Sequence, residues 1–149
     1  MPRPAVVPYQ PLIPGNTGSV GRLAVATDTP LHLVRPLGFS LESSRLKRAG
    51  LDYWPRLDLH LHDEIPPKPS GGRLVAFSSR SKTPYWDVGL GCGDYLLFGP
   101  EDNGLSAEIM EDADEVVSLP IREGERSLNL AMAVAIALFE ALRRTDWGR

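Results

Sequence analysis

The sequence has little cysteine and no long uninterrupted hydrophobic run. Cys92 is the one cysteine among 149 residues, so neither an intrachain disulfide nor a cysteine-based zinc site can form. The longest apolar stretch, Leu128 to Leu142, contains Asn129 and Glu140 and is shorter than the roughly 20 residues that a membrane-spanning helix needs. Two prolines interrupt the first apolar run, which is untypical of a secretory signal. We therefore expect a cytoplasmic protein without a membrane segment.

Histidine is also scarce, and several catalytic motifs are missing. The sequence contains no G-x-S-x-G, Walker A or H-E-x-x-H motif. His60 and His62 alternate on an expected strand beside Asp63, a pattern that suggests the hypothesis of a metal site. Against it, His32 is distant in sequence, and no further ligands follow at metal-binding spacing. We therefore expect no metal, and we interpret the histidines as surface or core residues. Cys92, between two glycines, is interpreted as a packed or turn residue.

What is present has ordinary globular proportions. With 42% hydrophobic and 23% charged residues, the chain predicts a single domain over residues 1–149. The net charge of −3 is uneven: residues 1–50 hold six Lys/Arg against two acids, whereas residues 101–125 hold nine acids against one arginine. The basic N-terminal part of the chain is suited to binding the phosphates of a nucleic acid. The alternative is that Arg45, Lys47 and Arg48 are simply a solvated helix face.

Short apolar runs alternate with helical patterns, which is typical of an α/β sheet with crossover helices. The expected strands cover residues 5–7, 31–34, 74–77, 95–98 and 115–119. A first helix is expected after Gly18, with an apolar stripe of Val20, Leu23, Ala24 and Thr27 and with Arg22 pointing away from it. A last helix, from about Ser127 to Arg144, is apolar nearly all round and predicts burial or packing against a second subunit. Residues 63–72 indicate a loop.

Three glycine-bearing segments are candidates for ligand binding. Gly15–Gly18 follows a strand and opens a helix, so its N–H groups can hold an anion or a ribose hydroxyl; spacing alone favours Asn16 and Thr17 as helix caps. Gly89–Gly93 precedes its strand and therefore indicates a turn. Phe98–Gly104 follows a strand, and its glycines allow a backbone or a flat ligand to approach closely, with a plain turn as the alternative.

Taken in order, these segments form a recognisable set. It comprises Pro14-Gly-Asn-Thr-Gly-Ser-Val-Gly-Arg22, Leu31-His-Leu-Val-Arg-Pro-Leu-Gly-Phe39, Arg48-Ala-Gly-Leu-Asp-Tyr53, Leu97-Phe-Gly-Pro-Glu101 with Gly104, Leu119-Pro-Ile-Arg122 and Arg126-Ser-Leu-Asn-Leu130. The set resembles the signatures of the tRNA wobble-nucleotide 2′-O-methyltransferases of the SPOUT class, from Tyr9 to Leu142. Two features depart from the family: Ser19 stands where Asn is usual, and the Pro66-Pro-Lys-Pro69 loop replaces a longer helical segment.

The resemblance implies a fold, a reaction and partners. The expected fold is a mostly parallel α/β sheet with helices on both faces and a C-terminal trefoil knot. The implied enzyme is a cytoplasmic homodimer that uses S-adenosylmethionine, releases S-adenosylhomocysteine and needs no metal. Its implied substrate is the tRNA anticodon stem-loop, with cytidine or a modified uridine at position 34 as the target nucleotide.

The resemblance also implies site residues. The expected donor-contacting residues are Phe77, Gly99, Glu101, Leu119, Ile121, Ser127 and Leu128, and Glu101 either holds its own loop or binds the first motif across the cleft. Arg22 is placed beside the reacting hydroxyl. Because a guanidinium stays protonated, we favour an orienting role for Arg22 over proton abstraction. Asn16 is expected to position Arg22 or the ribose.

Two other readings stay open. In the first, the chain is a non-catalytic RNA-binding module of the same fold. In the second, it is an unrelated α/β domain that binds a different nucleotide. The intact Arg22, Gly99 and Ser127 argue against the module. In the enzyme reading, the last helix lies near a dimer interface, where a charge at Ala133 or Ala137 is expected to weaken association.

Overall fold

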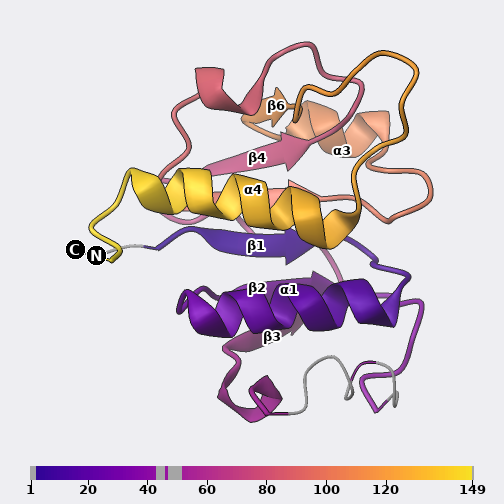
Figure 1. Ribbon diagram of the computed structural model, residues 1–149, viewed down its shortest axis with the longest axis vertical. Coiled ribbons are helices and arrows are strands. Elements are labelled where there is room, and N and C mark those ends of the chain that lie inside the picture. Colours follow the sequence, from indigo (N-terminus) through magenta and orange to yellow (C-terminus); the bar gives the residue numbers. More distant parts are fainter. Residues whose placement is uncertain (1–2, 43–45, 47–51, 149) are drawn as a thin grey trace.

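A six-stranded sheet forms the centre of the molecule in the computed structural model, which describes residues 3–42, 46 and 52–148. The strands pair in parallel in the order β3-β2-β1-β5-β4-β6. They are β1 (Ala5–Pro8), β2 (Leu31–Val34), β3 (Leu59–His62), β4 (Arg73–Phe77), β5 (Asp94–Phe98) and β6 (Glu115–Val117). Because the strands are parallel, their carboxyl ends lie along one edge of the sheet (Figure 1).

Helices cover both faces of the sheet, as the sequence predicts. Helices α1 (Pro14–Ala26) and α4 (Leu130–Arg143) lie side by side over one face and begin at the carboxyl edge (Figure 1). Their buried side chains pack on alternate strand residues such as Val6, Leu33 and Leu96. The other face packs against the short α3 (Ala107–Asp112). Two 3-10 helices, η1 (Trp54–Arg56) and η2 (Tyr85–Asp87), lie in connections.

The expected strands are confirmed to within two residues, but both long helices begin elsewhere than predicted. Helix α1 begins at Pro14, before the Gly15–Gly18 segment, because proline at a first helical position has a suitable φ and needs no N–H partner. Helix α4 begins only at Leu130, because the Asn129 side chain accepts from the backbone N–H of Ala131 and of Met132 and caps it.

Other expectations have different outcomes. The stripe of α1 is buried or half-buried while Arg22 is exposed, and residues 63–72 and 89–93 form the predicted loop and turn. Helix α3 was not expected, because six residues with three apolar side chains are too short to show a helical period. Arg45, Lys47 and Arg48 lie outside the described residues. The C-terminal knot and the single domain stay predictions.

The three histidines lie together on the sheet face opposite α1 and α4. Parallel register places His60 beside His32, with ring centroids 4.5 Å apart, and the His32 Nδ1 atom lies 2.8 Å from the His62 Nε2 atom. In the described ranges, no three or more His, Cys, Asp or Glu side chains are arranged to hold a metal. Burial, and secondarily the charges of His60 and His62, lower the pKa of His32 to about 4.

This depressed pKa predicts a loss of stability in mild acid. An unfolded histidine binds a proton near pH 6.5, whereas folded His32 stays neutral until about pH 4, so the unfolded state binds more protons between these values and stability falls as pH falls through them. At pH 5 the cost relative to pH 7 is on the order of 2 kcal/mol from this residue. We expect urea unfolding at both pH values to show that His32→Gln removes most of this difference, whereas His60→Gln, which removes only a secondary cause of the lowered pKa, retains most of it. Equal pH dependence in wild type and His32→Gln would contradict this assignment.

Candidate functional site

A cavity of about 420 Å³ opens at the carboxyl edge of the sheet. Four segments line it: the start of α1, the residues after β4, the loop after β5, and the segment that leads from β6 into α4. All seven residues expected to contact a donor line this cavity, and Asn16 lines it as well. The fold therefore brings together signatures that are far apart in the chain.

Aromatic rings and close backbone packing shape the cavity wall. Phe77 and Phe98, at the ends of neighbouring strands, stack with ring centroids 4.6 Å apart. A Cβ atom on Gly99 would lie 2.5 Å from the carbonyl carbon of Gly104, so only glycine permits this loop to fold back on itself. Gly104 has a φ of +68°, in the left-handed region. Both readings of the Phe98–Gly104 segment describe this loop: residues 101–103 form a turn, and the Gly104 backbone closely approaches Gly99 within it. Contact with a flat ligand stays a prediction.

The Glu101 carboxylate joins the loop after β5 to the first motif. It accepts hydrogen bonds from the backbone N–H of Leu12 at 2.7 Å and of Ile13 at 2.9 Å. It also accepts from the Asn16 side-chain amide at 3.2 Å. Of the two placements considered for Glu101, it therefore binds the first motif across the cleft.

Asn16 in turn joins the first motif, Pro14–Arg22, to the motif Arg126–Leu130 that leads into α4. Its side-chain oxygen accepts a hydrogen bond from the Asn129 amide at 2.9 Å. The expectation that Asn16 and Thr17 cap α1 is wrong: the N-cap is Ile13, which has no side-chain cap, and Thr17 is buried. Asn16 thus holds Glu101 and Asn129 in place, and its contact with a ribose stays a prediction.

Arg22 lies outside the cavity wall, on a stretch of α1 that is fixed from its other side. The Tyr53 hydroxyl donates to the carbonyl of Gly18 at 2.6 Å. A Cβ atom on Gly21 would lie 2.9 Å from the Trp54 ring, so glycine lets the indole pack directly on the helix. Burial raises the pKa of Tyr53, while the nearby Arg22 charge acts in the opposite direction. The backbone that carries Arg22 is therefore clamped, and its side chain is exposed.

Sequence reasoning missed Arg80 as a cavity residue. Arg80 lines the cavity mouth on the loop after β4, and its guanidinium donates to the backbone carbonyl of Asn103 at 3.2 Å. The signal available was the polar and basic run Ser78–Thr83, which follows a buried strand at the sheet edge where the other motifs also end.

Comparison with known proteins agrees with this architecture. The family model of the SpoU rRNA methylases matches residues 3–139. The chain belongs to this family. A tRNA (cytidine(34)-2′-O)-methyltransferase of Methylovorus glucosotrophus is 41% identical over 147 residues, which are 95% of this chain and 96% of that protein. One of Saccharophagus degradans is 40% identical over 144 residues, or 93% and 94%.

Solved structures of the family have the same fold. A structure described as giving insights into 2-OH methylation of C/U34 on tRNA superposes with a TM-score of 0.89 at 48% identity and covers 96% of each chain. The SpoU methyltransferase AviRb from Streptomyces viridochromogenes, in complex with the cofactor AdoMet, superposes with a TM-score of 0.81 at 25% identity and covers 97% of this chain and 58% of that one. Family membership and the α/β fold are thereby confirmed.

The hydrogen bonds of Glu101 predict a stability effect. Glu101→Gln replaces one acceptor oxygen by an N–H₂ group that faces the N–H donors of Leu12 and Ile13, so we expect a loss of about 1–3 kcal/mol in the free energy of unfolding. Chemical denaturation measures it. The matched control is Asp102→Asn on the same loop, because the Asp102 carboxylate accepts from the adjacent Asn103 backbone and spans no cleft. Equal stability of the two variants would rule out the bridging role.

Proposed function

We propose that this chain transfers the methyl group of S-adenosylmethionine to the ribose 2′-hydroxyl of the wobble nucleotide, cytidine or a modified uridine at position 34, in the tRNA anticodon stem-loop. The observation that carries this proposal is the cavity, which gathers residues of the family segments Pro14–Arg22, Leu97–Gly104, Leu119–Arg122 and Arg126–Leu130 at one sheet edge. Two relatives covering nearly the whole chain support the reaction and the substrate by their names. We place the protein in the cytoplasm; no helix in the described part of the chain is long and apolar enough to span a membrane.

The residues present fit such a methyl donor. The cavity volume suits a nucleoside-sized ligand, and Phe77, Leu119 and Leu128 supply apolar surface for a flat adenine. The backbone around Gly99 supplies hydrogen-bonding groups for its edge. When bound, S-adenosylmethionine supplies a sulfonium methyl group, leaves as S-adenosylhomocysteine, and requires no metal. Ile121 and Ser127, exposed on the segment before α4, also line the cavity and are placed to contact the ligand.

Arg22 orients the substrate in this proposal. A ribose 2′-oxygen has to meet the methyl group in line and release its hydroxyl proton to solvent as the new C–O bond forms, so most of the protein's contribution is positioning. The guanidinium is exposed on a clamped helix turn and holds several N–H donors in a plane, which suits simultaneous contact with ribose and phosphate oxygens. Asn16 supports this arrangement indirectly, because it fixes the start of the helix that carries Arg22.

Substitution of Arg22 tests the proposed chemistry. Arg22→Ala should leave folding and donor binding nearly intact and lower single-turnover methyl transfer by at least about 100-fold, the lower range for a positioned catalytic group. Arg22→Lys should recover little, because an ammonium lacks the planar fork. Mass spectrometry of tRNA nucleosides measures the product. Arg56→Ala, which removes an exposed arginine from η1, serves as the control. Near-wild-type turnover of Arg22→Ala would remove this residue from the chemical step.

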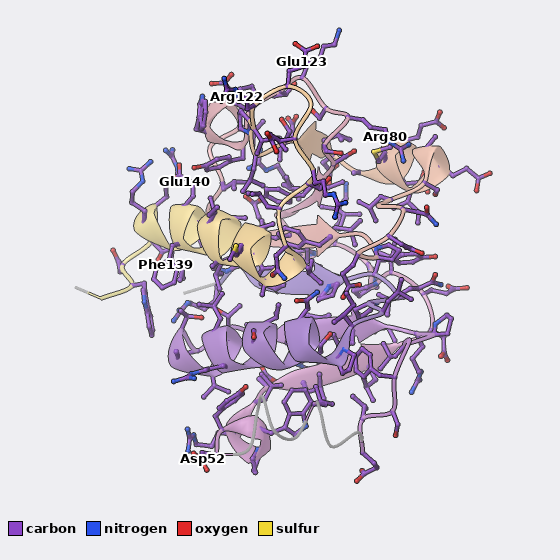
Figure 2. The ribbon with its side chains drawn as sticks, turned by 45° about the vertical axis from the view of Figure 1, so that its right-hand side comes forward. Asp52, Arg80, Arg122, Glu123, Phe139 and Glu140 are labelled. Carbon is purple, nitrogen blue, oxygen red and sulfur yellow. The ribbon has the colours of Figure 1, made fainter. Side chains whose placement is uncertain are left out.

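We further propose that two copies associate through the outer face of α4. Met132, Ile136 and Phe139 are 62%, 40% and 51% exposed and recur at a spacing that places them on one helix face. Figure 2 shows Phe139 on the outer side of the helix, away from the sheet. The expectation that a charge at Ala137 acts on the interface is wrong, because Ala137 is fully buried in its own subunit; Ala133 is half-buried and lines the cavity.

The exposed stripe predicts the effect of a surface charge on assembly. Phe139→Glu places a carboxylate in the proposed apolar interface. Because burying an unpaired charge is costly, we expect the dissociation constant of the dimer to rise by at least about 10-fold. Analytical ultracentrifugation at micromolar concentration measures it. Glu111→Lys on the exposed surface of α3 is the control and should stay dimeric. A wild-type monomer at this concentration would contradict the proposal.

The alternative function is a non-catalytic RNA-binding module of the same fold. Isothermal titration with S-adenosylmethionine, followed by a methylation assay on tRNA, separates the two. Donor binding with a 2′-O-methylated nucleotide 34 supports the enzyme, and donor binding without turnover supports the module. Absence of donor binding at millimolar concentration would overturn the enzyme.

A further inference from the structure

Arg80 is the one basic side chain among the described residues that line the cavity. It lies on the loop after β4, and Figure 2 shows it beside α3, on the opposite side of the molecule from Phe139 and Glu140 of α4. Among the described residues, its guanidinium has one hydrogen-bond partner, the Asn103 carbonyl on the loop across the mouth. That bond uses one of five guanidinium N–H groups, so the side chain is held at the mouth with donors left for a ligand.

The charges around Arg80 distinguish between two candidate ligands, the methyl donor and the RNA backbone. The other charged residues that line the cavity are Glu101 and Asp102, and the Glu101 carboxylate already accepts three hydrogen bonds from the first motif. The methyl donor carries a positive sulfonium and a positive amine against one carboxylate. The positive Arg80 guanidinium therefore gains little electrostatic attraction from binding it. An RNA strand carries a phosphate on each side of the reacting ribose, and a planar guanidinium binds phosphate oxygens in pairs.

We propose that Arg80 binds a backbone phosphate of the RNA next to the target nucleotide and thereby holds the ribose over the cavity. The hydrogen bond to Asn103 fixes the guanidinium between the loops that form the two sides of the mouth. Arg80 is a substrate-binding residue in this proposal, separate from Arg22 on α1. The inference rests on the proposed function, since it takes the cavity as the place of methyl transfer.

The test compares RNA binding and donor binding in the same variants of the full chain. Fluorescence anisotropy with a labelled anticodon stem-loop, titrated between about 50 and 200 mM salt, measures Kd and its salt dependence. For Arg80→Ala we expect Kd to rise by about 10-fold and the slope of log K against log salt to fall by about 1, as for loss of one phosphate contact. Titration with S-adenosylmethionine should give an unchanged Kd. Arg80→Lys should restore part of the affinity as a point charge.

Lys82→Ala is the matched control, because Lys82 is an exposed cation two residues further along the same loop and does not line the cavity. A smaller effect of Lys82→Ala on Kd supports a specific contact by Arg80, and an equal effect overturns it. Unchanged RNA affinity in Arg80→Ala also overturns it, as does loss of donor affinity alone. If wild type binds the stem-loop without methylating it, the proposed reaction fails while the Arg80 contact is still measured; if wild type binds no RNA, both fail.

Discussion

The Glu101 carboxylate is the constraint on which the site depends. It satisfies two backbone N–H groups ahead of α1 and holds the Asn16 amide, which binds Asn129, the residue that caps α4. Through these contacts, one side chain fixes the positions of the first turns of both long helices relative to the loop after β5. Each of these hydrogen bonds is worth only about 0.5–3 kcal/mol, which is modest beside the hydrophobic core. Their importance is geometric, because they tie the loop after β5 to the start of α1, and the start of α1 to that of α4.

The strand order explains why these loops meet. The chain runs outward from β1 through β2 to β3, crosses to β4 and β5, and ends with β6 at the far edge. The order therefore reverses between β1 and β5, at the middle of the sheet. In parallel α/β sheets the connections diverge at such a point and leave a crevice at the carboxyl ends of the strands. The cavity lies there, between the residues after β1, β4 and β5, and α4 closes one side of it.

Local sequence predicted the elements better than their contacts. Residues 31–34 are a predicted and observed strand because a short apolar run is buried on both faces, which needs no knowledge of its neighbours. Asn16 was assigned as a cap because asparagine after a strand commonly has that role, whereas its partners lie on loops far along the chain. The histidine cluster depends on the register of β2 with β3, which composition does not encode. In α4 the apolar residues surround the helix, so periodicity could not distinguish buried Ala137 from exposed Ile136.

Net charge is a poor guide to RNA binding here for a structural reason. Several acidic side chains accept hydrogen bonds within the fold and neutralise buried or half-buried donors. Asp94 binds Arg73 and the Gly91 backbone, and Asp114 binds Lys68 and the Leu74 backbone. These pairs hold the amino ends of β4 and β5, away from the cavity, and each contributes no net charge. Because each pair is neutral, the formal charge of −3 comes from the remaining residues, and residues 101–125 alone hold nine acids against one arginine. Arg22 and Arg80 are exposed, whereas the cavity itself is lined by one arginine and two carboxylates, so the site offers an RNA phosphate individual guanidinium contacts and not a net positive field.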